Sequence, residues 1–300
     1  MRRDSKGDTE YWNKWVVRAE GRVAKVKQLR NEELPREFEY EPQYVYDLSI
    51  LHLKLMLGCY SRGDDRNMLS PYFPGLLDAW GEAESLGEGV WSESEKLLRR
   101  SWGLNLHYYV NCFWLVGLAL VLEIQEDQWH RLLLLIGNEG EDVLLDRVIA
   151  SRQVERRIGD EICFPKAYKE LLKVIDAPAS EQPALLRSYV ESWFVNLKDS
   201  GSTNVERYLR TPYWYTYGDE NFEGGTYFGR WCIEAVAVAK AFGIDDSLCL
   251  DHPNYPGDLL RDGRSPRYED EMQAVEGGSE QEAAEQASVR RSLWRRLFNI

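Results

Sequence analysis

The chain has 300 residues, of which 44% are hydrophobic and 12% aromatic, so it can bury one large core or two smaller ones. Its formal net charge of −13 argues against DNA, RNA or an anionic membrane as the main partner and favours a basic one, although many proteins are acidic for solubility alone. The longest apolar run, residues 112–122, is well short of the roughly 18 residues that a membrane-spanning helix needs.

The start of the chain and its cysteines indicate the compartment. Residues 1–8 are charged and contain no apolar stretch of signal-peptide type. The cysteines are odd in number, widely spread and mostly set among apolar neighbours: Cys59, Cys112, Cys163, Cys232 and Cys249. We therefore expect a cytoplasmic protein with buried, reduced thiols.

Residues 12–30 are predicted to form an amphipathic helix, because apolar side chains recur there at steps of three and four with basic residues between them. Residues 47–59 are ambiguous. Leucines at every second position from Leu51 to Leu57 give the period of a strand. Since the segment is rich in good helix formers and almost lacks β-branched residues, we predict a second helix.

Helix signals continue along the chain. The string Ser-Glu-Ser-Glu at residues 92–95 has the spacing of a capping box, which opens a helix. The next four helices are predicted at residues 104–125, 127–136, 141–153 and 165–175. Gly137 ends the second of them, and Pro165 lies in the first turn of the last.

Two later helices are predicted to be buried. Ser180 opens a long one that Gly201 stops, and residues 227–242 form a central one that ends at Gly243. The first carries an apolar stripe at helical spacing that we expect in the core: Leu186, Tyr189, Val190, Trp193, Phe194 and Leu197. The expected fold class is all-α and multi-helical, with a helical-hairpin N-terminal part packed on a larger helical C-terminal domain.

Composition and these elements together predict the domain boundaries. The expected parts are an N-terminal helical domain at residues 8–100, a C-terminal one at 104–262, an acidic disordered linker at 263–288 and a basic amphipathic tail at 289–300. Disorder is expected because residues 269–286 have no basic residue and almost nothing to bury. The tail is predicted to dock on the acidic body or, as the alternative, to touch a membrane.

Signs of catalysis are sparse. The four histidines are isolated, and the sequence has no Cys-x-x-Cys pair, nucleophile elbow or phosphate-binding glycine loop. The best enzymatic hypothesis is a carboxylate cluster that binds Mg²⁺, as in all-helical prenyl-diphosphate enzymes. Its members would be Glu234, Asp245, Asp246, Asp251 and Asp258, with His252 beside them. The other enzymatic hypothesis is a sugar-cleaving helical enzyme, because 11 Trp and 17 Tyr could line a pocket around two carboxylates.

Each acidic candidate also has a structural interpretation, which we prefer. Asp245 or Asp246 can cap the short helix that follows them. Glu234 would be costly to bury unpaired, so we expect it to pair with an arginine, for which Arg230 is a candidate, or to cap a neighbouring helix. Residues 251–253, Asp-His-Pro, are predicted to form a turn. On this interpretation the protein is not an enzyme.

The same stretch carries a recognisable pattern. Residues 225–247 run Gly-Thr-Tyr-Phe-Gly-Arg-Trp-Cys-Ile-Glu-Ala-Val-Ala-Val-Ala-Lys-Ala-Phe-Gly-Ile-Asp-Asp-Ser, and residues 252–259 run His-Pro-Asn-Tyr-Pro-Gly-Asp-Leu. The pattern resembles the C-terminal domain of PoNi-like immunity proteins, which are partners of polymorphic nuclease toxins. Matching positions are Gly229, Trp231, Glu234, Ala235, Ile244, Asp245, Asp246, Ser247, Tyr255, Pro256, Asp258 and Leu259.

Residues 60–66, together with Leu69, Phe73 and Trp80, resemble the N-terminal domain of the same family, so the resemblance covers about residues 10–262. It implies an all-helical, non-enzymatic protein without a cofactor or metal, kept in the cytoplasm of the toxin producer. Such a protein binds and neutralises a DNA-cleaving effector, often one delivered by a type VI secretion system, and protects the producer and its siblings. The linker and the tail lie outside the pattern.

The expected partner is a cognate, basic nuclease toxin, with neither nucleic acid nor a membrane as a partner, and a monomer is compatible with the sequence. A nuclease carries a basic surface for phosphates, so an acidic inhibitor can be steered to it and can cover the site that DNA needs. The candidates for toxin binding are Asp219, Glu220, Glu223, Asp245, Asp246, Asp251, Tyr255 and Asp258.

Two further groups of residues in this stretch have expected roles. The aromatic residues beside the acids could anchor the partner or could simply be core: Tyr213, Trp214, Tyr215 and Tyr217. The family-signature residues expected to maintain the fold are Gly229, Trp231, Glu234, Ile244, Pro256 and Leu259.

Overall fold

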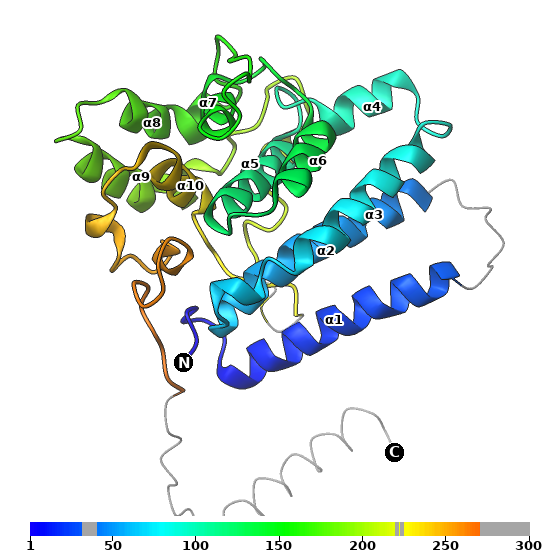
Figure 1. Cartoon of the computed structure of the whole chain (residues 1–300), viewed down its shortest axis with the longest axis horizontal. Helices are drawn as coiled ribbons and strands as arrows, with labels where there is room; N and C mark the ends of the chain where they lie inside the picture. Colours follow the sequence, from blue (N-terminus) through cyan, green and yellow to red (C-terminus); the bar gives the residue numbers. More distant parts are fainter. Residues whose placement is uncertain (32–40, 220–221, 223–224, 271–300) are drawn as a thin grey trace, which may run out of the picture. The chain divides into compact units, whose positions relative to one another are not determined.

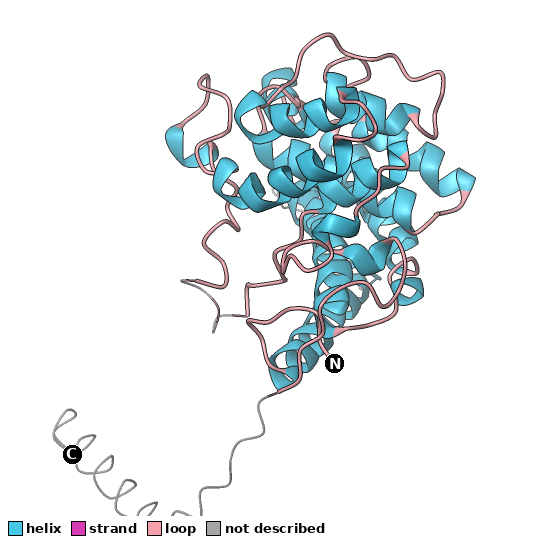
Figure 2. Ribbon diagram, turned by 90° about the vertical axis from the view of Figure 1, so that its left-hand side faces the viewer, coloured by secondary structure: helices cyan, strands magenta, loops and turns pink. Residues whose placement is uncertain are grey.

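The computed structural model describes residues 1–31, 41–219, 222 and 225–270. Residues 1–268 form one compact unit. Every regular element among the described residues is a helix (Figure 2). The β-type pairing there is an isolated bridge between Arg2 and Tyr268. The fold is all-α and multi-helical, as the sequence predicts. The predicted tail at residues 289–300 and most of the predicted linker lie outside the described residues.

Most of the helices follow one another along the chain with short connections, but the long segment 197–232 separates α9 from α10. The α-helices of the described residues are α1 Thr9–Asn31, α2 Glu41–Arg62, α3 Tyr72–Gly87, α4 Glu93–Arg100, α5 Leu106–Val121, α6 Glu126–Ile136, α7 Val143–Ala150, α8 Pro165–Asp176, α9 Gln182–Asn196 and α10 Ile233–Phe242. The 3₁₀ turns there are η1 Arg66–Met68, η2 Arg207–Leu209, η3 Ser247–Cys249 and η4 Gly257–Leu259.

The long N-terminal helices α1, α2 and α3 are shown together in Figure 1, and α2 packs against both of the others. Because α2 is covered on more than one side, the consecutive residues Leu55, Met56 and Leu57 are each 2% exposed or less. This burial explains the strand-like alternation in the sequence, and it confirms the helix predicted at residues 47–59. In α1, the buried Trp12, Trp15 and Val16 confirm the amphipathic pattern.

The centre of the fold is the packing of α5 against α10. Every residue of α5 except His107 is buried. A Cβ atom built on Gly117 of α5 would lie 2.9 Å from the Cβ of Ala237 and 2.9 Å from a methyl group of Ile233. Small residues on both helices therefore set how closely they approach.

Several helix ends confirm the sequence signals. Ser92 and Glu95 form the capping box of α4, and Gly137 follows the last residue of α6. Pro165 is the first residue of α8. Gly243 ends α10 in the left-handed conformation, with a φ of 64°. The predicted apolar stripe of α9 is also confirmed, because all its members are buried except Phe194, which is half-buried.

The helix predicted from residue 227 starts too early, since α10 begins at Ile233. Gly229 has a φ of 101°, which a helix does not allow, and the backbone N–H of Cys232 donates to the carbonyl oxygen of Asn254 at 2.9 Å. The preceding residues are therefore held against another segment. The helices predicted at 104–125 and 141–153 are shorter in the structure, at Leu106–Val121 and Val143–Ala150.

The sequence patterns do not predict α3. Its first turn contains Pro74, and Gly75 and Gly81 weaken the helical signal. The structure gives Gly75 a packing reason, because a Cβ atom there would lie 2.7 Å from the His52 ring of α2. All five cysteines are free, and the predicted burial is confirmed for all but Cys163, which is half-buried.

Candidate functional site

The aromatic run at residues 213–217 lies in turns between η2 and α10 and starts the stretch that the sequence singles out. Trp214 is 3% exposed, with its ring centroid 5.0 Å from that of Trp114. Tyr215 stacks on Phe194 of α9, with the ring centroids 4.3 Å apart. Trp214 is thus a core residue, and Tyr215 is engaged with α9.

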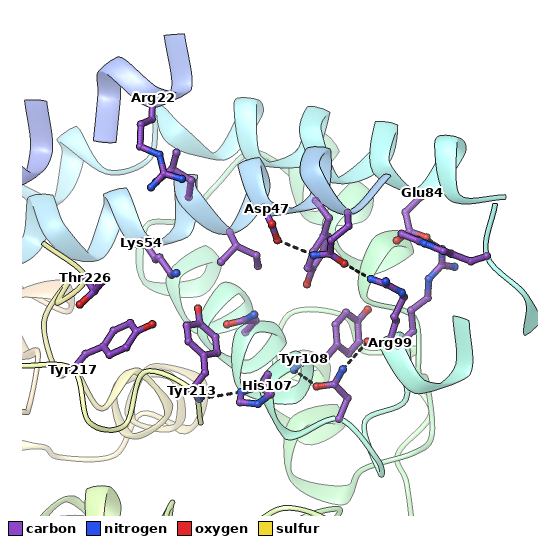
Figure 3. A pocket seen from close by; sticks show the side chains of 18 of the residues that line it. Arg22, Asp47, Lys54, Glu84, Arg99, His107, Tyr108, Tyr213, Tyr217 and Thr226 are labelled. Atoms are coloured by element: carbon purple, nitrogen blue, oxygen red, sulfur yellow. Dashed lines mark hydrogen bonds and ion pairs between the residues drawn. The ribbon is translucent and has the colours of Figure 1, made fainter. Parts of the chain in front are cut away.

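Tyr213 and Tyr217 have a different environment. Tyr213 is 42% exposed, and both rings line a cleft of about 540 Å³ whose other walls come from the helices α1 to α5 (Figure 3). The ammonium group of Lys54 lies 4.9 Å from the ring centroid of Tyr213. These two tyrosines are therefore accessible to a ligand, in surroundings that include a cation.

Glu234 lies in the first turn of α10 and is fully buried. The hydroxyl of Tyr168 donates a hydrogen bond to its Oε1 at 3.1 Å. Burial raises the pKa of Glu234 to about 7, although hydrogen bonding by neighbouring backbone, indole and phenol groups lowers it in part. The expected ion pair with Arg230 is wrong, because that arginine is engaged elsewhere.

Arg230 holds the turn that carries Asp219. Its guanidinium donates to the carbonyl oxygen of Tyr217 at 3.0 Å and to the carboxylate of Asp219, and its Cζ lies 4.2 Å from the ring centroid of Phe194. Lys6 also pairs with Asp219, at 2.6 Å. Although burial opposes it, the hydrogen bonds from Arg230 and Lys6 hold the pKa of Asp219 below its usual value. Asp219 is thus exposed, but its charge is already matched by two cations.

Asp258 is fully buried and joins both ends of the described chain. The Nε of Arg3 and a terminal guanidinium nitrogen of Arg267 donate to its Oδ2, each at 2.5 Å. The backbone N–H groups of Arg264 and Ser265 donate to its Oδ1, each at 2.7 Å. Burial alone would raise the pKa of Asp258, but these donors outweigh it and lower the pKa. Residues 264–267 of the predicted linker therefore pack on the helical body.

Asp246 and Tyr255 form a second buried contact beside Asp258. Tyr255 is fully buried, and its hydroxyl donates to Oδ2 of Asp246 at 2.8 Å. Arg264 donates to Oδ1 of the same carboxylate at 2.6 Å. Asp246 is 4% exposed. Asp246, Tyr255 and Asp258 therefore lie inside the fold, where they hold segments together and do not present a surface to a partner.

Asp245 and Asp251 lie at the surface. Asp245 accepts hydrogen bonds from the backbone N–H of Ser247 at 2.9 Å and from its hydroxyl at 3.0 Å. Its side chain thus satisfies the first N–H of η3, as a cap does, from the position before the N-cap residue Asp246, which makes no side-chain cap hydrogen bond. The side chain of Asp251 is 79% exposed and pairs with Arg187 of α9. The turn predicted at residues 251–253 is confirmed.

These two acids belong to an exposed surface that α9 and η3 form together, which we call the α9 face. Arg187 joins its halves, donating to Glu191 at 2.7 Å, to the carbonyl oxygen of Leu248 at 2.9 Å and to Asp251. Leu248 is 51% exposed and Val195 67% exposed. The α9 face comprises Arg187, Glu191, Val195, Asp245, Leu248 and Asp251. It combines acids with apolar side chains, as protein-binding surfaces do.

Of these six residues, sequence reasoning identified only Asp245 and Asp251. Glu191 and Val195 fall between the stripe residues of α9, which marks them only as outward-facing. Leu248 follows a serine and precedes a cysteine and another leucine, a context that predicts a core residue. Glu220 and Glu223, also proposed for toxin binding, lie outside the described residues.

The family-signature residues are packed into the fold. The indole N–H of Trp231 donates to the hydroxyl of Ser61 in α2 at 2.8 Å. Ile244, Pro256 and Leu259 are buried. In the described ranges, no group of three or more His, Cys, Asp or Glu side chains could hold a metal ion. A helix long and apolar enough to cross a membrane is likewise absent from that part of the chain.

A search among curated proteins finds no match. Among solved structures, the chain is similar to the crystal structure of protein PA2201 from Pseudomonas aeruginosa, with a TM-score of 0.62 and 18% sequence identity. The match covers 86% of this chain and 89% of that one. At this level of identity the likeness shows a common fold alone.

Two family models match consecutive parts of the chain. The N-terminal model of the PoNe immunity protein (PoNi) matches residues 3–134, and the C-terminal model of PoNe immunity proteins (PoNi) matches residues 140–259. The first match ends within α6 and the second begins just before α7, and the second includes the buried residues Glu234, Asp246 and Asp258. The chain therefore belongs to the family of PoNe immunity proteins.

Proposed function

We propose that this protein binds a cognate, secreted nuclease toxin that cleaves DNA and neutralises it inside the producing cell, which protects that cell and its siblings. The observation that carries the proposal is the pair of family matches, which run from residue 3 to residue 259. Immunity proteins act as inhibitors by binding, so the acids of the C-terminal stretch need no catalytic role. Delivery of the toxin by a type VI secretion system belongs to the same proposal.

The α9 face supports this function by its chemistry. Asp245 and Asp251 are exposed there, and Leu248 and Val195 add apolar area. Acids attract a basic nuclease over a distance, whereas apolar side chains give affinity once the surfaces meet. Asp219 is exposed as well, but two cations, Lys6 and Arg230, pair with its single carboxylate. On the α9 face, by contrast, Arg187 is shared between Glu191 and Asp251. We therefore place the toxin on the α9 face.

Co-expression tests the function. When the chain is expressed with the toxic nuclease encoded by the neighbouring gene, we expect growth to be restored and the two proteins to purify as one complex. Growth measured on induction and size-exclusion chromatography of the lysate provide the two readouts. If cells still die while the chain is folded and abundant, and no complex forms, the proposed function is wrong.

Charge reversal tests the surface. The double variant Asp245→Lys and Asp251→Lys should slow association with the toxin by about tenfold or more at low salt, because it removes the attraction that steers encounter. The salt dependence of the rate should flatten. Association rates measured at several ionic strengths would show both effects.

The matched control makes the same change of net charge away from the α9 face. Glu155→Lys and Asp160→Lys replace two exposed acids between α7 and α8. This control should retain most of the wild-type rate. Equal slowing in both double variants would mean that only net charge affects association. The proposal that the toxin binds the α9 face would then be wrong.

A further inference from the structure

The cleft beside Tyr213 has no role in the proposed function. It measures about 540 Å³, within the range of small-ligand pockets. Figure 3 shows side chains from α1, α2, α4 and α5, together with Tyr213, Tyr217 and Thr226, directed toward a common space. Its walls are rich in aromatic residues: Trp15, Tyr46, Trp91, Tyr108, Tyr213 and Tyr217.

Charges at one end of the cleft are matched within the protein. Arg100 forms an ion pair with Glu84. Arg99 donates to the side-chain oxygen of Gln43, whose amide nitrogen donates to Asp47 at 2.7 Å. Figure 3 shows this chain of contacts along the wall. Most polar groups here pair with one another, although the buried Nε of Arg100 has no hydrogen-bond partner among the described residues.

The other end holds two cations, Lys54 and Arg22, that no carboxylate of the described residues contacts directly. Among the described residues, neither Lys54 nor Arg22 makes an ion pair or a hydrogen bond, and Asp47, the carboxylate on the same helix as Lys54, is engaged by Gln43. Lys54 instead lies over two rings, 4.9 Å from the centroid of Tyr213 and 5.6 Å from that of Phe228. A cation over aromatic faces is only partly compensated for the water it has lost.

The two cations also act on each other. Burial lowers the pKa of Lys54; Tyr217 and Asp47 oppose this effect, and the positive charge of Arg22 adds a smaller lowering effect. An anion between the two groups would replace this repulsion with two attractions in a partly desolvated site, where charge-assisted hydrogen bonds are strong. The tyrosine hydroxyls beside Lys54 can add neutral donors.

We propose that the cleft is a binding site for a small organic anion, with its carboxylate or phosphate group between Lys54 and Arg22 and a flat ring against Tyr213 and Tyr217. The cations fix the charge of the ligand, and the aromatic walls and the volume favour a ring over a bare ion. This site is separate from the α9 face, so it stands independently of the proposed toxin contact.

Isothermal titration calorimetry with simple probes tests the site. Benzoate and phenyl phosphate should bind to the full chain with 1:1 stoichiometry and a dissociation constant on the order of 1 mM or lower. The neutral analogue benzamide should bind at least about tenfold more weakly, because it cannot form charge-assisted hydrogen bonds. Inorganic phosphate, which lacks the ring, should also bind more weakly than phenyl phosphate.

Variants separate the site from general charge effects. Lys54→Met keeps the length of the side chain and should weaken benzoate binding about tenfold or more. Its melting temperature should not fall, because the variant removes a desolvated ammonium group. The control Lys169→Met changes an exposed lysine of α8 by the same charge and should bind benzoate like the wild type.

Three results would overturn the proposal. The first is no detectable binding of either aryl anion at about 10 mM. The second is equal affinity of Lys54→Met and wild type for benzoate. The third is equal binding of benzamide and benzoate, which would make the cleft a site for rings without charge selection. If inorganic phosphate binds as tightly as phenyl phosphate, the ring assignment is wrong.

Discussion

Replacing Asp258 with asparagine is expected to lower the free energy of unfolding by about 3–5 kcal/mol, the usual cost of removing one partner from a buried ion pair. Asparagine has nearly the same shape and can still accept from the backbone N–H groups of Arg264 and Ser265. It leaves Arg3 without its anion, and the side chain of Arg3 is fully buried. The fall in the free energy of unfolding therefore measures what the charge of Asp258 contributes, apart from the shape of its side chain.

Urea unfolding followed by circular dichroism measures this effect. Asp219→Asn is the control, since that carboxylate also pairs with two cations but its side chain is 52% exposed. Exposed ion pairs contribute about 0–1 kcal/mol, so this variant should be close to wild type. Similar losses in both variants would show that burial does not set the strength of these pairs.

The pH dependence has a definite sign. The pKa of Asp258 is lowered in the folded protein, so its stabilising effect is complete above the ordinary aspartate pKa near 4 and is lost as pH falls through the folded value. The gap in stability between wild type and Asp258→Asn should therefore be widest near neutral pH and shrink in acid. A gap that widens below pH 4 would contradict the assignment.

Much of the helical architecture follows from local rules. The capping box at Ser92, the proline that opens α8 and the glycine that ends α10 act within a few residues of where they stand. Such signals are visible in one sequence. By contrast, α3 owes its Gly75 to the His52 ring on another helix, a contact between distant residues that no local pattern reveals.

The candidate site shows the same division. Asp245 acts locally as a cap, and the sequence anticipates that role. Asp246 and Asp258 look alike in the sequence, but their burial depends on Arg264, Arg267 and Arg3, the last of which lies at the other end of the chain. Acidity predicts attraction to a basic partner, whereas access to that partner depends on tertiary structure. The sequence alone could not separate the exposed acids, such as Asp245, from the buried ones, Asp246 and Asp258.

Glycine at position 229 should be close to indispensable for the fold. Its φ of 101° is a conformation that side-chain-bearing residues rarely adopt. A Cβ atom there would lie 2.3 Å from the Ser61 hydroxyl oxygen and 2.3 Å from the Trp231 indole nitrogen, the two atoms that share a hydrogen bond of 2.8 Å. Gly229→Ala would therefore break the contact that joins α2 to the segment before α10.

We expect Gly229→Ala to lower the free energy of unfolding by about 3 kcal/mol or more, from about 1–2 kcal/mol of backbone strain and about 1–3 kcal/mol of overpacking. Gly243→Ala is the matched control. Its φ is also positive, at 64°, but nothing lies within 4 Å of the added Cβ, so only the strain of about 1–2 kcal/mol remains. Chemical denaturation of both variants gives the two values.

The comparison decides why a glycine stands in the family signature at this position. A larger loss at Gly229 than at Gly243 means that the close approach of Ser61 and Trp231 requires it, so the signature joins a residue of the N-terminal match to one of the C-terminal match. Equal losses would reduce its role to backbone conformation. If the Gly229→Ala protein keeps wild-type stability but no longer binds the toxin, this glycine acts in toxin binding and not in maintaining the fold.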